Sequence, residues 1–227
     1  MATWFPYVLY LHITAGMIAL FVAPIAMLTA KGGGAHRRWG KVYFWSMAVV
    51  ALTAMPMALY RPTVFLALVA IFSFYFAFAG YRSIVTKKTG PRPIDHAAAA
   101  ISLLGSLGLL TLAIHPLPHQ FLPAPVVSLV FGLLGTTFAG TDLLRLLRPS
   151  KDRMTWWYNH MARMLGSYIA AVSAFSAVNF KFLPVALRWT WPSLIGVPCV
   201  VIWTRYYRRK FAGKPRSTAT SEPQPIS

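Results

Sequence analysis

The chain has 227 residues, of which 57% are hydrophobic and only 11% are charged. So few charged side chains cannot cover the surface of a soluble globule, and the composition therefore indicates a protein surrounded by lipid. The formal net charge of +18 is divided among short loops between apolar segments and is not gathered on one face, so we expect no nucleic-acid partner.

Seven apolar segments follow one another along the chain, each near the roughly 20 residues that a helix needs to cross a bilayer. We expect transmembrane helices over Tyr7–Leu28, Ala35–Tyr60, Thr63–Tyr81, His96–Ile114, Ala124–Leu144, Trp156–Phe180 and Arg188–Tyr207. The first segment has no basic residue before it and is too long for a signal-peptide core, so we interpret it as an uncleaved helix. The sequence thus predicts an all-α, seven-helix transmembrane domain over residues 1–211 and, from its Ser, Thr and Pro content, a disordered tail over residues 212–227.

The cations form four clusters, which follow the first, third, fifth and seventh apolar segments and contain eighteen of the 22 Lys and Arg residues. Because cytoplasmic loops carry an excess of Lys and Arg, this pattern places the N-terminus outside and the C-terminus in the cytoplasm. We therefore expect a multi-pass protein of the inner (plasma) membrane, in contact with the lipid bilayer and with anionic lipid headgroups.

Small residues indicate which helix faces meet, because helices in lipid associate where their backbones can approach closely. His12 shares one face of the first helix with Ala15 and Ala19, so we expect it to point into the bundle. The third helix is rich in Phe and has no charge, and for this reason we expect it at the periphery, facing lipid.

Ionisable groups inside a bilayer are costly and are candidates for function. Four of them, His36, Asp142, His160 and Arg163, lie near the predicted cytoplasmic side and could converge on one pocket. His36 and His160 are candidate ligands of haem b or of a transition metal, with neutral imidazole as the donor. The alternatives are a loop histidine among the headgroups for His36 and a hydrogen-bonded packing histidine for His160.

Three further interpretations concern single polar residues. Arg163 needs a partner, and Asp142 is the carboxylate that we expect to pair with it, although Arg145 one turn later is another possible partner of Asp142. Asp95 is a residue type that caps helices, and we expect it to begin the fourth helix. His12 could serve either as a ligand or in packing.

Several sequence segments resemble an uncharacterised family of bacterial multi-pass membrane proteins, domain of unknown function 2306. They are Leu11-His12-Ile13, the stretch from Lys31 to Met47, Asp142-Leu143-Leu144 and the stretch from His160 to Ala171. The resemblance extends to about Tyr206 and implies recurring positions at His12, His36, Asp142, His160 and Arg163, but no reaction. Members of this family commonly have an aromatic residue where this chain has His96, so His96 is not expected to be a shared ligand.

Two functions of different class are compatible with these residues. The one that we favour is a redox protein in which His36 and His160 bind haem b or a metal, with Asp142 as a supporting acceptor and Arg163 as a charge partner of the cofactor. The other is a non-redox transporter of a small solute or lipid, or an assembly partner of another membrane complex. No residue pattern marks the chain as an enzyme.

Overall fold

All regular secondary structure is helical in the parts that the structure, a computed structural model, describes: residues 2–61, 63–118, 123–148 and 152–212. These residues contain seven helices and no strand, and each helix is long and apolar enough to cross a membrane. The helices are α1 (Phe5–Leu28), α2 (Gly34–Tyr60), α3 (Val64–Thr89), α4 (Pro93–Ile114), α5 (Pro125–Leu147), α6 (Thr155–Asn179) and α7 (Val185–Ala212). The predicted seven-pass fold is confirmed. Of the predicted tail, Ala212 ends α7, and residues 213–227 lie outside the described residues.

The largest difference from the predicted boundaries is at the end of α3, which continues two turns past Tyr81. The polar residues that follow Tyr81 extend the helix beyond its apolar part until Gly90, whose φ of 72° is a backbone angle that glycine adopts readily and other residues rarely do. The helix α4 begins three residues earlier than predicted, because Pro93 suits the first turn of a helix and the Asp95 carboxylate accepts the Arg92 N–H at 2.8 Å. Asp95 caps α4 as expected, but it does so from the third position of the helix and does not begin it.

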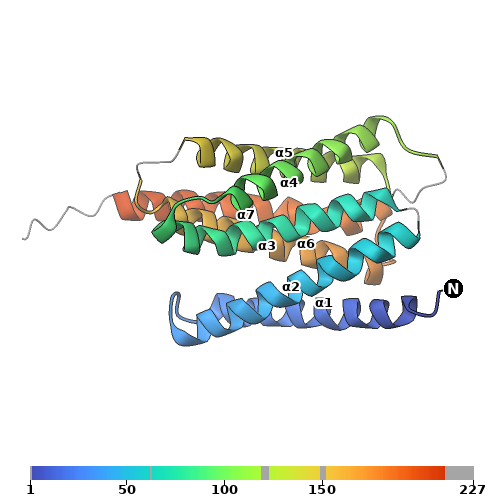
Figure 1. Ribbon diagram of the computed structural model, residues 1–227, viewed down its shortest axis with the longest axis horizontal. Helices are drawn as coiled ribbons and strands as arrows, with labels where there is room; N and C mark the ends of the chain where they lie inside the picture. Colours follow the sequence, from blue (N-terminus) through green and yellow to red (C-terminus); the bar gives the residue numbers. More distant parts are fainter. Residues whose placement is uncertain (1, 62, 119–122, 149–151, 213–227) are drawn as a thin grey trace, which may run out of the picture.

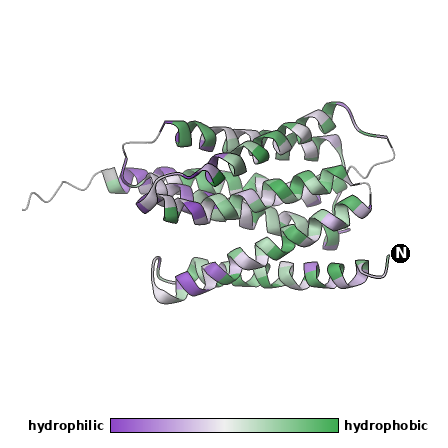
Figure 2. Cartoon of the chain, viewed as in Figure 1, coloured by the Kyte–Doolittle hydropathy of each residue, from purple (hydrophilic) through white to green (hydrophobic). Residues whose placement is uncertain are grey.

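The bundle is built around α3 and α6, which pack along each other (Figure 1). The α1–α2 hairpin lies on one side of this centre and the α4–α5 hairpin on the other, while α7 packs on α6. Hydrophilic residues gather at the end where α2 begins and α7 ends (Figure 2). We call this end, at which α1, α3, α5 and α7 finish and α2, α4 and α6 begin, the basic end.

The expectation that α3 is peripheral is wrong. Phe65, Phe72 and Phe76 are buried, and Phe72 stacks on Phe131 of α5 with ring centroids 5.9 Å apart. An uncharged aromatic surface suits the centre of a bundle as well as it suits lipid, because both surroundings are apolar. Hydropathy therefore cannot distinguish a central helix from a lipid-facing one.

Small residues bring the helices together as predicted. Ala15 and Ala19 are buried between α1 and its neighbours. In α5, a Cβ added to Gly135 would lie 2.1 Å from the Ser106 Oγ atom of α4, so this contact requires glycine. In α3, a Cβ added to Gly80 would lie 2.8 Å from the Met164 Sδ atom of α6. The close approach of α3 to α6 at Gly80 positions His160, one of the candidate residues described below.

Candidate functional site at the basic end

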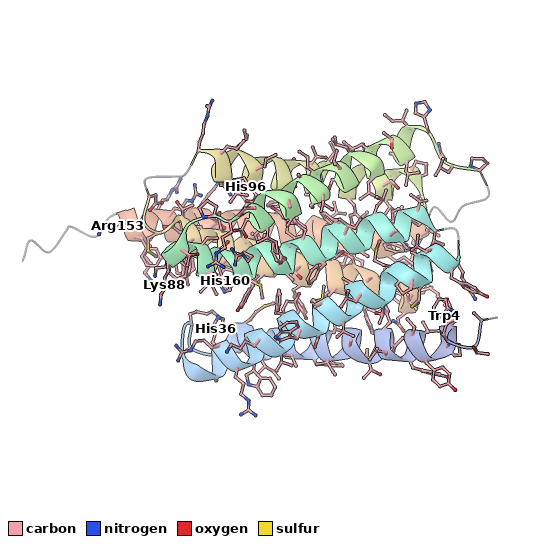
Figure 3. All side chains as sticks on the ribbon, in the orientation of Figure 1. Trp4, His36, Lys88, His96, Arg153 and His160 are labelled. Carbon is pink, nitrogen blue, oxygen red and sulfur yellow. The ribbon has the colours of Figure 1, made fainter. Side chains whose placement is uncertain are left out.

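The predicted inner polar layer is present at the basic end, but its side chains belong to two separate clusters. Asp142 lines a cavity between α3, α4, α5 and α6, which we call the ionic cavity, and Arg163 binds Asp142 from outside this lining. His36 and His160 meet between α2 and α6, and we call them the histidine pair (Figure 3). One shared pocket of all four side chains, as the sequence suggested, is not observed.

The ionic cavity has a volume of about 320 Å³. Its aromatic walls include Tyr75, Phe78 and Trp156. The charged side chains that line it are four cations and three carboxylates, namely Arg82, Lys87, Arg145 and Arg153 with Asp95, Asp142 and Asp152. These three aspartates are three of the only four acidic residues in the chain.

The predicted pair of Arg163 and Asp142 is confirmed and is bidentate. The Arg163 Nε and Nη2 atoms donate to the two Asp142 oxygens at 2.7 and 2.5 Å, and Arg163 is only 3% exposed. The Tyr75 hydroxyl also donates to Asp142, at 3.0 Å, and the Arg145 Nη1 atom lies 3.5 Å away. The guanidinium of Arg163 further contacts the Phe138 ring. This network compensates the charge of the Arg163 guanidinium, whose burial without a carboxylate partner would be very costly.

A second bidentate pair joins α3 to α4. The Arg82 Nε and Nη2 atoms donate to Asp95 at 2.5 and 2.7 Å, and Asp95 at the same time caps α4. Sequence reasoning missed this pair, because it placed Arg82 in a loop beyond the expected end of the third helix. The available signal was the absence of a helix-breaking residue between Tyr81 and Gly90.

Three more charged residues of the cavity, Asp152, Arg145 and Lys87, also have contacts within the protein. Asp152 accepts the Met154 N–H at 2.8 Å, at the start of α6. Arg145 donates through Nη1 to Asn159 at 3.0 Å, and the Lys87 ammonium lies 3.9 Å from the centre of the Trp156 ring. Every carboxylate that lines the cavity therefore already accepts hydrogen bonds from the protein.

In the histidine pair, both rings are held by backbone carbonyl groups. The His36 Nδ1 atom lies 2.8 Å from the Ala26 oxygen in the last turn of α1, and the His160 Nδ1 atom lies 2.9 Å from the Gly80 oxygen. A carbonyl oxygen can only accept, so Nδ1 is the donor in each neutral ring and Nε2 carries the lone pair. The ring centroids are 6.2 Å apart, with an interplanar angle of 81°.

The loop between α1 and α2 places a cation beside the histidine pair. The Lys31 ammonium donates to the Met27 carbonyl, next to the carbonyl that holds His36. Burial lowers the pKa of the Lys31 ammonium. The surroundings of the pair are therefore cationic.

The other histidines among the described residues lie apart from these clusters. The His12 Nδ1 atom lies 2.9 Å from the Thr53 Oγ1 atom and 3.1 Å from the Val50 oxygen, so His12 joins α1 to α2 far from His36. His96 contacts the Arg92 carbonyl at the start of α4, and His115 is exposed. Of the two roles left open for His12, the contacts favour packing.

Comparison with known proteins supports the resemblance inferred from the sequence. Residues 9–102 match the family described as predicted membrane protein (DUF2306). The match includes His12, His36 and Asp95 and ends before Asp142 and His160. No curated protein and no solved structure matches the chain.

Proposed function

We propose that this chain is a bacterial inner-membrane protein whose ionic cavity binds a small organic anion, as the binding site of a non-redox transporter of small solutes or lipids. The family match and the seven apolar helices support a multi-pass membrane protein. The proposed orientation places the basic end in the cytoplasm, where its cations would contact anionic headgroups of the inner leaflet.

The observation that carries the proposal is the surplus of cationic donors in the cavity. Four cations and three carboxylates line the cavity. Asp142 is also bound by Arg163, which does not itself line the cavity. Each carboxylate is occupied by donors of the protein, whereas the described contacts of Arg145 use only one of its three nitrogen atoms. An incoming anion would therefore find unused donors, whereas an incoming cation would compete with donors of the protein for the carboxylates.

The size and the walls of the cavity favour an organic anion over a bare inorganic ion. About 320 Å³ lies within the range of small-molecule sites. Tyr75, Phe78 and Trp156 offer apolar surface beside the cations. The ligand class that fits is an oxyanion, carboxylate or phosphate, attached to an apolar group.

The haem or metal hypothesis concerns the histidine pair, which does not line this cavity. Asp142 and Arg163 bind each other through both oxygens and two nitrogens, so neither is available as a partner of a cofactor. The solute-binding hypothesis is thus the one that the geometry of the Asp and Arg residues supports best.

Calorimetric titration of the protein in phosphatidylcholine nanodiscs tests the proposal. Benzoate and phenyl phosphate should bind, whereas benzyl alcohol and benzylammonium, which have the same ring, should not. Repeating the titration in nanodiscs with phosphatidylglycerol distinguishes the source of the anion, because a site for lipid headgroups will be blocked by that lipid. Equal binding of benzylammonium would contradict the proposal.

Variants locate the binding site. Arg145→Gln should raise the Kd for phenyl phosphate at least about tenfold, equivalent to about 1.4 kcal/mol. The fold should persist, because Asp142 retains Arg163 and Tyr75. Arg148→Gln is the matched control, since Arg148 is an exposed cation at the end of the same helix that does not line the cavity. An equal loss in both variants would indicate general attraction to the basic end.

A further inference from the structure

We propose that the histidine pair binds a copper(I) ion through the Nε2 atoms of His36 and His160, with the Met164 thioether as a third ligand. This site is separate from the ionic cavity and shares no side chain with it. It therefore does not depend on the proposed binding of an organic anion.

The separation of the two rings fits a single bridging ion. A metal–nitrogen bond to imidazole is about 2.0–2.1 Å long, and the ring centre lies roughly 1 Å behind the nitrogen, so two rings on one ion have centroids at most roughly 6.5 Å apart. The observed centroid separation of His36 and His160 is 6.2 Å. This separation lies within the limit, so one ion can bind both rings if their Nε2 atoms face each other.

The hydrogen bonds of the pair prepare both rings for coordination. Histidines that bind metals usually donate their other ring N–H to a carbonyl or a carboxylate, which fixes the tautomer and the orientation of the ring. The Ala26 carbonyl has this role for His36, and the Gly80 carbonyl has it for His160. Ala26 lies in the last turn of α1, where carbonyls have no intrahelical partner.

Met164 supplies a sulfur atom on the correct face of α6. It follows His160 by four residues, so the two side chains lie on one face of the helix. Its Sδ atom packs against Gly80, the residue whose carbonyl holds His160. Thioether sulfur and imidazole nitrogen together favour copper(I).

The surroundings disfavour ions that need more ligands or carry more charge. Within the described part of the chain, no group of three or more His, Cys, Asp and Glu residues could hold a metal. Zinc sites are almost always four-coordinate, whereas copper(I) is stable with two or three ligands. The Lys31 ammonium nearby also repels a divalent ion twice as strongly as a monovalent one.

The test is a competition titration of ascorbate-reduced copper(I) against bicinchoninate, with the full chain in nanodiscs. One copper per chain is expected. His36→Gln and His160→Gln should each weaken binding at least a hundredfold, and Met164→Leu should weaken it about tenfold. His96→Gln is the matched control, because His96 also contacts a carbonyl through Nδ1 but lies on α4, and it should bind as the wild type does.

X-ray absorption of the copper-loaded wild type tests the ligands without any substitution. The expected first shell contains two nitrogen atoms and one sulfur atom. A shell without histidine nitrogen, or unchanged affinity in both histidine variants, would overturn the proposal. Tighter binding of zinc than of copper(I), or a haem absorption band in the purified protein that His36→Gln removes, would also overturn it.

Discussion

The ionic cavity and the histidine pair lie at the same end of the bundle and present different groups to a ligand. In the cavity the carboxylates already accept hydrogen bonds and cations remain in excess, whereas each ring of the pair has its Nδ1 atom held by a carbonyl and its Nε2 atom left for a ligand. Asn159 and His160 are neighbours in α6, yet Asn159 lines the cavity and His160 belongs to the pair. Consecutive residues of a helix point about 100° apart, so equal depth in the membrane does not make one site.

The strongest way to break the comparison is to disturb the charges of the cavity. Asp142→Asn leaves the buried Arg163 without a carboxylate and should lower the free energy of unfolding by about 3–5 kcal/mol, as measured by denaturant titration in detergent. Arg163→Met should have a similar effect. The double variant should lose much less than the sum, and additive losses would contradict a coupled pair.

The second test disturbs the contact between α3 and α6 beside the histidine pair. Gly80→Ala introduces a Cβ atom 2.8 Å from the Met164 Sδ atom and 3.1 Å from its backbone nitrogen, which should separate α3 from α6 at a cost of about 1–3 kcal/mol. Gly140→Ala is the control, because its nearest neighbour would be 4.0 Å away. If both variants unfold at the same midpoint concentration of denaturant as the wild type, the close contact of α3 with α6 at Gly80 is contradicted.

The smallest effect is expected for a substitution that removes one hydrogen bond from the wall of the ionic cavity. Tyr75→Phe deletes the hydroxyl that donates to Asp142 and should lower the free energy of unfolding by about 1 kcal/mol. Tyr7→Phe, on the exposed side of α1, should change it by less than about 0.5 kcal/mol. A Tyr75→Phe variant as stable as the wild type would show that Arg163 alone satisfies Asp142.

Sequence reasoning succeeded where one physical requirement decides the outcome. The seven helices follow from the length of apolar segment that a bilayer needs, and the partner of Arg163 follows from the cost of an unpaired cation in lipid. Both are present in the structure.

It failed where two helices must be placed relative to each other. The aromatic surface of α3 has no feature that distinguishes neighbouring helices from lipid, and the pair of Arg82 and Asp95 depends on where α3 ends. The separation of His36 from Asp142 depends on which helices pack together. The depth of a residue in the membrane does not determine which helices are neighbours.

The most direct test of two separate sites is calorimetric titration of phenyl phosphate into the double variant His36→Gln, His160→Gln. The structure predicts a Kd within about twofold of the wild-type value, since neither histidine lines the ionic cavity. A Kd raised tenfold or more, as expected for Arg145→Gln, would show that the polar groups of the basic end form one site and would contradict the account.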